Sequence, residues 1–235
     1  MVSIDRVYQT VQRILNKEQR GYLPPVEFNL FANMAQTEIF EQYFYDLEQF
    51  MRIPMTDSNY ADIVNNINEK IEILERTETI DPSTPQIGSL PEIFLYPADF
   101  YRLGVVTISD TGIIADEVSH KKIPFITASP LTYPTLTQPV FVRHAGGIAL
   151  YPQLAGVAIN MVYVGEPREV YWGYVNVQGK ANYNANTSAD FELHASELPE
   201  LVVKICALAG VAIRAADVAQ FAQADEASMI QQEKA

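Results

Sequence analysis

The chain has 235 residues, with 16 Lys and Arg against 29 Asp and Glu, and its formal net charge is −13. Its 48% hydrophobic and 19% charged residues are typical of a folded globular protein and exclude a disordered one. The negative net charge argues against a surface that binds nucleic acid, because phosphate contacts need clustered Lys and Arg. The single cysteine excludes an internal disulfide framework and a zinc site built from several cysteines.

No apolar run approaches the roughly 20 residues that a membrane-spanning helix needs. The first residues lack a basic stretch followed by an apolar core, so we expect no secretory signal. Neither feature indicates a function.

Helical periodicity dominates the first eighty residues. Apolar spacing predicts a helix over 4–17, a second from about 24 to 52, and a third that follows Pro54. Together these indicate a helical hairpin or bundle over residues 1–80.

The second helix carries two apolar stripes instead of one, which means that it is covered on more than one side. A neighbouring subunit could supply part of this cover. We therefore expect subunit contacts from the second stripe, which consists of Met34, Phe40, Phe44 and Met51.

In the region 81–195 the spacing of apolar residues changes from the period of a helix, 3.6, to that of a strand, 2. This change predicts a small antiparallel β region inserted into the bundle. A linker is expected over 77–90, an irregular stretch over 173–189, and a last short strand over 191–194. Strands are predicted at 93–96, 103–109, 113–118 and 157–164, with a hairpin over 139–151.

Four prolines punctuate the segment 124–139 within this region. Their spacing forbids a helix and disfavours a central strand, so we predict an extended arm or long loop. Pro130, Tyr133 and Pro134 of this arm are candidate subunit contacts.

The region 196–235 starts with a helix whose apolar face is predicted to complete the bundle. The tail 214–235 has only a thin apolar face, so we expect a neighbour to order it, or its end to fray. The predicted fold class is α+β.

No phosphate-binding loop, metalloprotease pair, nucleophile elbow or kinase signature is present. Asp116, Glu117 and His120 could bind a divalent ion if folding brought them together, but we favour a solvated loop. Cys206 is expected to be a small core residue. Trp172 and its tyrosine neighbours could stack on bases, but a domain or subunit contact is favoured because basic residues are sparse. We predict no catalytic, cofactor or metal site.

Local phrases spread over the chain resemble a structural protein family of tailed phages, found in crAss-like and related podovirus-type phages. These phrases are NKEQRGYLPP (16–25), EFN (27–29), QTEIF (36–40), DFYRL (99–103), IPF (123–125), SPLTYPT (129–135), PVFVR (139–143), WGY (172–174), DFELH (190–194) and LAGV (208–211).

The resemblance implies a virion protein, assembled in the bacterial host cytoplasm, that forms a ring of the head-to-tail connector beneath the portal. About twelve copies would close the ring and match the symmetry of the portal. Double-stranded DNA would pass through the lumen without specific binding, and no cofactor or membrane is expected. The implied partners are other copies of the chain, the portal protein and adjacent connector or tail rings.

The C-terminal region would reach the portal, with candidate contacts at Val218, Phe221, Met229 and Ile230. Two alternatives remain open. One is a tail-side neck, stopper or fibre-attachment module, and the other is a metal-assisted hydrolase that uses Asp116, Glu117 and His120.

Overall fold

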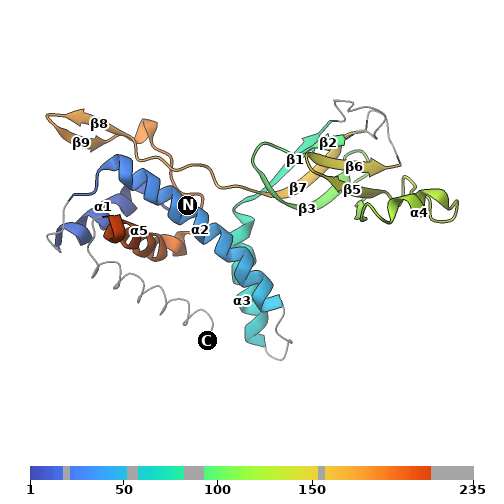
Figure 1. The fold of residues 1–235 in the computed structure, drawn as a ribbon, viewed down its shortest axis with the longest axis horizontal. Helices are drawn as coiled ribbons and strands as arrows, with labels where there is room; N and C mark the ends of the chain where they lie inside the picture. Colours follow the sequence, from blue (N-terminus) through green and yellow to red (C-terminus); the bar gives the residue numbers. More distant parts are fainter. Residues whose placement is uncertain (18–21, 52–57, 82–92, 153–156, 213–235) are drawn as a thin grey trace. The chain divides into compact units, whose positions relative to one another are not determined.

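The computed structural model describes residues 1–17, 22–51, 58–81, 93–152 and 157–212, and its elements are drawn in Figure 1. The chain has the predicted α+β class. It divides into two compact units, which we call the helical unit (Met1–Ile73 and the chain from Pro167 on) and the β unit (Leu74–Glu166). The predicted boundaries at 80 and 195 are therefore misplaced, because residues 167–195 belong with the helices.

The helical unit contains α1 (Ile4–Lys17), α2 (Pro25–Met51), α3 (Ser58–Glu72) and α5 (Leu198–Ala212). Two 3-10 turns accompany them, at Ala185–Thr187 and Ala195–Glu197. Helix α5 contacts α1 and α2, and α3 contacts α2. The predicted helices and the completion of the bundle by the C-terminal helix are therefore present. The apolar faces meet through the buried residues Ile4, Val11, Leu15, Phe28, Ala35, Ile39, Leu201 and Ile205.

A β-hairpin replaces the irregular stretch predicted after residue 173. It consists of β8 (Tyr174–Val177) and β9 (Lys180–Tyr183). Its two turn residues, Gln178 and Gly179, both have positive φ, at 50° and 78°, as a two-residue type I′ turn requires. The strand predicted at 191–194 is wrong, since Phe191 makes only an isolated bridge to Val2.

The β unit holds two sheets, with strand orders β1-β7-β3 and β2-β6-β5-β4. Their pairs are antiparallel except for β4 with β5, which are parallel. Both sheets contribute to one apolar core, which includes Phe94, Leu103, Phe141, Ile148 and Met161. The strands are β1 (Glu75–Ile80), β2 (Ile93–Leu95), β3 (Phe100–Ile108), β4 (Asp116–Glu117), β5 (Val140–His144), β6 (Gly147–Tyr151) and β7 (Ile159–Gly165).

The strands predicted at 93–96, 103–109 and 157–164 and the hairpin over 139–151 are confirmed, with shifts of up to three residues at their ends. The strand predicted at 113–118 is reduced to the two residues of β4 and an isolated bridge at Ile114. The linker predicted at 77–90 is wrong in its first part, because β1 pairs along its full length with β7. The rest of that prediction, from 82 on, lies outside the described residues. Gly147 is needed where it stands, since an added Cβ would clash with the carbonyl oxygen of Phe94 on β2.

The proline-rich arm is not wholly extended. It begins with a short helix, α4 (Ile123–Ala128). Pro124 lies in the first turn of α4, where proline is tolerated because the amide there has no intrahelical partner. The prediction that the proline spacing forbids a helix is therefore wrong for residues 123–128 and agrees with the irregular loop after them.

Candidate functional site

A line of exposed apolar side chains runs along the outer face of α2. Val26, Leu30 and Met34 recur every four residues, and Tyr22 precedes them; Leu30 is 59% exposed. Residues at this spacing lie above one another on one face of a helix. We call these four residues the α2 stripe. Contiguous exposed apolar residues of this kind are typical of interaction sites.

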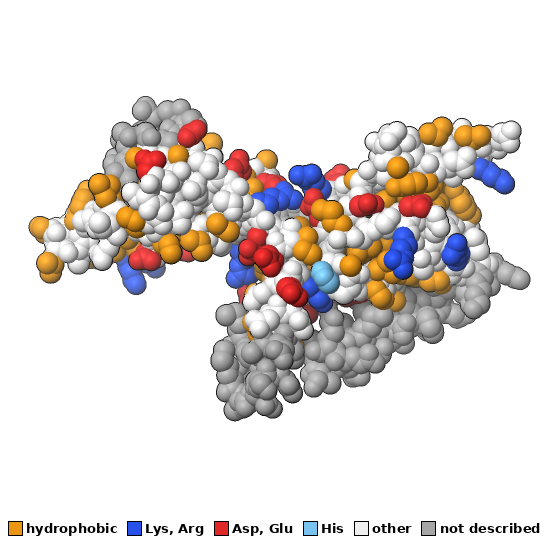
Figure 2. Space-filling view, turned by 180° about the vertical axis from the view of Figure 1, so that it is seen from behind, with side chains coloured by type: hydrophobic (Ala, Val, Ile, Leu, Met, Phe, Trp, Pro, Cys, Tyr) orange, Lys and Arg blue, Asp and Glu red, His pale blue; other side chains and the backbone are white. Residues whose placement is uncertain are grey.

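A second apolar surface lies on the arm of the β unit. Phe125 is 78% exposed and Leu131 94% exposed, and Tyr133 and Leu136 are also exposed. We call these four residues the arm surface. Figure 2 shows hydrophobic side chains gathered at the end of the β unit that carries α4.

The arm is held by hydrogen bonds within its own segment while it presents these side chains. The hydroxyl of Thr132 donates to the carbonyl of Ile126 at 3.1 Å, and the backbones of Thr135 and Gln138 bond to each other. A loop fixed in this way presents its apolar side chains in a defined arrangement, which is typical of binding loops.

The predicted subunit-contact residues divide into two groups. Met34, Pro130 and Tyr133 are exposed. Phe40, Phe44, Pro134 and Trp172 are buried inside their own units. These four are core residues of the subunit, so the expectation that they form a free contact surface is wrong. The side chain of Met51 and the portal-contact candidates Val218, Phe221, Met229 and Ile230 lie outside the described residues.

Part of the cover on α2 comes from a distant segment of the same chain. The side-chain amides of Asn29, Asn33 and Gln36 hydrogen-bond the backbone of residues 168–172, which lies extended against the helix. Asn33 accepts from the amide of Val170 at 2.8 Å and donates to its carbonyl at 2.9 Å. Asn29 pairs in the same way with Trp172, and Gln36 donates to the carbonyl of Arg168.

The geometry of this amide ladder follows from two regular repeats. From Asn29 to Asn33 four residues of helix rise about 6 Å, close to the rise of about 6.6 Å over two residues of extended chain. From Asn33 to Gln36 the helix rises only about 4.5 Å, and the longer side chain of glutamine spans the difference. The ladder supplies partners that a neighbouring strand would otherwise supply. Its sequence signal was available, since Asn29, Asn33 and Gln36 are amides at helical spacing inside an apolar helix.

Trp172 is buried at the end of this ladder. Its indole N–H donates to Asp5 Oδ1 at 3.1 Å, and its ring lies 4.1 Å from the ring of Tyr8 on α1. Tyr174 and Tyr183 of the β8–β9 hairpin flank it. The aromatic cluster is therefore a packing contact within the helical unit, and Trp172 is too buried to stack on a base.

Two of the three residues of the hydrolase alternative, Glu117 and His120, are engaged with other groups, and Asp116 is exposed. The carboxylate of Glu117 pairs with Arg143 at 2.7 Å, and His120 Nε2 lies 2.7 Å from the carbonyl oxygen of Arg143. The ring of His120 meets the ring of His144 edge-on at 4.6 Å. In the part of the chain that the structure describes, no three His, Cys, Asp or Glu side chains form a group that could hold a metal ion.

Cys206 is buried on α5, as predicted. Burial raises the pKa of its thiol to about 11, because the thiolate would lose its hydration. The thiol is therefore protonated at neutral pH and is suited to packing, not to nucleophilic attack.

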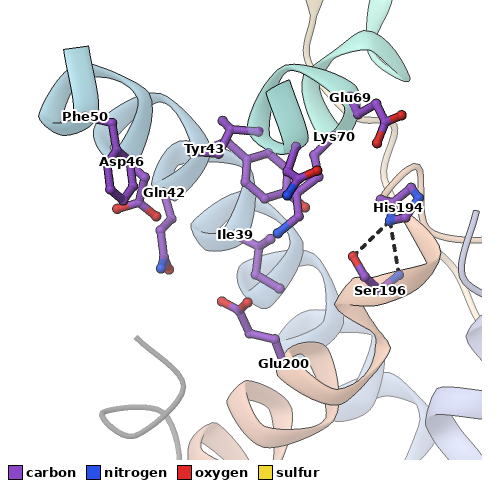
Figure 3. Close-up of a pocket in the computed structure, with 12 residues that line it drawn as sticks. Ile39, Gln42, Tyr43, Asp46, Phe50, Glu69, Lys70, His194, Ser196 and Glu200 are labelled. Atoms are coloured by element: carbon purple, nitrogen blue, oxygen red, sulfur yellow. Dashed lines mark hydrogen bonds between the residues drawn. The ribbon is translucent and has the colours of Figure 1, made fainter. Parts of the chain in front are cut away.

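A pocket of about 420 Å³ lies within the helical unit, and sequence reasoning missed it. Its lining comes from α2, from α3 and from the corner that leads into α5, which are three stretches distant in sequence. Figure 3 shows these side chains, with dashed lines joining His194 to Ser196. The lining residues are Ile39, Gln42, Tyr43, Asp46, Phe50, Asn66, Ile67, Glu69, Lys70, His194, Ser196 and Glu200.

Two lysines, Lys70 and Lys204, form ion pairs beside this pocket, and each pair has one buried member. Lys70 Nζ lies 2.8 Å from Glu197 Oε1, and Glu197 is buried. Lys204, which is only 3% exposed, lies 3.0 Å from Glu38 and 3.8 Å from Glu200. Both amines are therefore matched by carboxylates of the same unit, as buried charges require.

A scan against protein-family models and a search of curated protein sequences gave no match to this chain. Among the described helices, none is both long and apolar enough to span a membrane.

Proposed function

We propose that this chain is a non-enzymatic virion structural protein that forms a ring of the head-to-tail connector beneath the portal. The phrases that resemble tailed-phage structural proteins motivate the proposal. The observation that carries it is the pair of exposed apolar surfaces, the α2 stripe and the arm surface, on two separate units of one chain.

A closed ring needs heterologous contacts, in which each copy presents one surface to the copy ahead and a different surface to the copy behind. A chain with two unlike apolar surfaces can meet this need or can join one ring to the next. Burial of such side chains contributes roughly 25 cal/mol per Å² of apolar surface removed from water. We assign the α2 stripe to the contact between copies, where a different face of the neighbouring helical unit would meet it, and the arm surface to the adjacent ring or tail component.

The C-terminal region would provide the portal contact. Helix α5 packs on α1 and α2, so the chain that follows it starts from a fixed point of the helical unit. Deletion of residues 214–235 is expected to abolish co-sedimentation with the portal while the circular dichroism spectrum of the folded units persists. Unchanged portal binding by the truncated chain would contradict this assignment.

The net charge of −13 suits a passage for DNA. A lumen lined with like charge repels the phosphate backbone, so a transiting genome does not adhere to it.

Counting copies in particles tests the proposal. Peptide mass spectrometry of purified virions would measure this chain relative to the major capsid protein. About twelve copies per particle would support a connector ring. Absence of the chain from the particle would contradict any structural role in it. Crosslinking in the same particles separates a portal-side ring from a tail-side neck, stopper or fibre-attachment module by the partner that is captured.

A further inference from the structure

The pocket of the helical unit combines apolar walls with a polar edge. Ile39, Tyr43, Phe50 and Ile67 provide the apolar side chains. Its volume of about 420 Å³ falls within the range of sites that bind small ligands or inserted side chains. Asp46 and Gln42 come from α2. Residues 30 and 46 are about four and a half helical turns apart, so Asp46 lies on nearly the opposite side of α2 from Leu30. The pocket and the α2 stripe are therefore separate surfaces.

The charge of the pocket is not balanced. Its amine, Lys70, is matched by Glu197, which lies outside the lining, and Glu200 is shared with the buried Lys204. Asp46 differs from these, because its Oδ1 is buried and accepts no hydrogen bond from the described residues. Glu69 adds a further negative charge to the lining. A buried acceptor without a donor is costly, and a carboxylate that turned toward a donor on a ligand would remove this cost.

We propose that this pocket binds a basic side chain, arginine or lysine, presented by a partner polypeptide. The aliphatic stem would lie against Tyr43 and Ile67, as long basic side chains do on apolar surface. The cationic head would pair with the carboxylate of Asp46, which is half-buried and would turn toward it, and a charge-assisted bond of this kind is stronger than a neutral one. An acidic side chain is disfavoured, because it would meet the carboxylates of Asp46, Glu69 and Glu200. The inference does not depend on the connector role, since it names the chemistry of a ligand and not an assembly.

Two model compounds of equal shape test the proposal. Nα-acetyl-arginine N-methylamide carries the guanidinium group, and Nα-acetyl-citrulline N-methylamide replaces it with a neutral urea. Each is titrated into the ¹⁵N-labelled full-length chain, and amide chemical shifts are followed by NMR. We expect the arginine compound to shift amides around Asp46 and Lys70, with an affinity at least about tenfold higher than that of the citrulline compound.

Matched variants locate the receiving group. Asp46→Asn keeps the size of the side chain and removes its charge, and it should weaken the arginine compound by about tenfold. Glu41→Gln removes an exposed charge from another face of α2 and should change binding by less than about twofold. Equal binding of the two compounds, undiminished binding to Asp46→Asn, or an absence of shifts around the pocket would each overturn the proposal. Stronger binding of Nα-acetyl-glutamate N-methylamide would also overturn it, by assigning the pocket to an anion at Lys70.

Discussion

The β unit is one continuous stretch of chain, whereas the helical unit joins two stretches that the whole β unit separates in sequence. In the β unit, strands pair through their own backbones and bury an apolar core between two sheets. In the helical unit, the returning segment 168–172 is held by the side-chain amides of Asn29, Asn33 and Gln36. The strands of the β unit are held together around buried apolar volume, whereas segment 168–172 is fixed to α2 by matched polar groups.

This difference predicts how each unit responds to mutation. An apolar core loses stability in proportion to the volume removed, while a polar ladder loses it when one partner leaves the other unsatisfied. Trp172 is the single tryptophan and lies in the helical unit, so its fluorescence reports on that unit alone.

The largest effect is expected from Met161→Ala in the β unit. Met161 is fully buried on β7, and a cavity at such a site costs about 2–5 kcal/mol in the free energy of unfolding. Denaturant titration followed by far-UV circular dichroism should show an earlier transition, while the Trp172 fluorescence transition stays in place. If both transitions moved together, the two units would unfold as one and the comparison would fail.

Asn29→Ala should destabilise the helical unit by about 1–3 kcal/mol, since the buried amide of Trp172 loses its acceptor. The fluorescence transition is expected to move to lower denaturant and the β-unit transition to remain. Thr37→Ala is the matched control, because the exposed Thr37 hydroxyl donates to the carbonyl of Asn33 on its own helix and, among the described residues, to no group of the returning segment. That variant should stay within about 0.5 kcal/mol of the parent. Equal losses from the two variants would argue against the ladder.

The pH dependence of the helical unit at alkaline pH should reflect Cys206. Its pKa rises from 9.0 to about 11 on burial, so between these values the unfolded chain loses a proton that the folded chain keeps. The contribution of Cys206 to the free energy of unfolding is fully present below pH 9. Above pH 9 the free energy of unfolding should fall, by up to about 1.4 kcal/mol per pH unit, until the pH passes the folded pKa. Comparison with Cys206→Ala isolates this contribution from that of the tyrosines. The same alkaline slope in both proteins would contradict a buried thiol.

The smallest effect is expected from His144 in the β unit. Burial, and then the neighbouring His120, lower the pKa of His144. The unfolded chain therefore binds a proton at His144 more readily than the folded chain does. The β unit keeps its full stability above the ordinary histidine pKa of about 6.5 and loses part of it as the pH falls through the lower pKa of the folded state. His144→Asn should flatten this acid-side loss in the β-unit transition. A steeper loss of stability at acid pH in the variant would contradict the lowered pKa of His144.

Elements with a strong period were predictable from sequence. Helix α2 and strand β7 lie within two residues of their predicted ends, because each buries a regular apolar pattern. Strand β1 was missed because its sequence, ERTETI, is polar on both faces and gains its order only by pairing with β7.

The candidate sites were predictable only in part. Met34, from the second apolar stripe, and Tyr133, from the proline-rich arm, are exposed, and their role as subunit contacts stays a prediction. The burial of Phe40, Phe44 and Trp172 depends on contacts between segments far apart in the chain. Local periodicity does not show which distant segments meet. The pocket around Asp46 was missed for the same reason, since α2, α3 and the start of α5 each supply only part of its lining.

The assignment of the α2 stripe to the contact between copies can be tested most directly by thiol labelling. Leu30→Cys places a reactive thiol on the stripe, and the native Cys206 is buried with a raised pKa, so its background labelling is slow. Asp110→Cys, at an exposed turn of the β unit, provides the reference rate. Maleimide labelling is measured in the isolated chain and in purified particles. We predict rapid labelling of Leu30→Cys in the isolated chain and at least about tenfold slower labelling in particles, as in an interface core that excludes water. Equal rates in the chain and in the particle, relative to Asp110→Cys, would contradict the account.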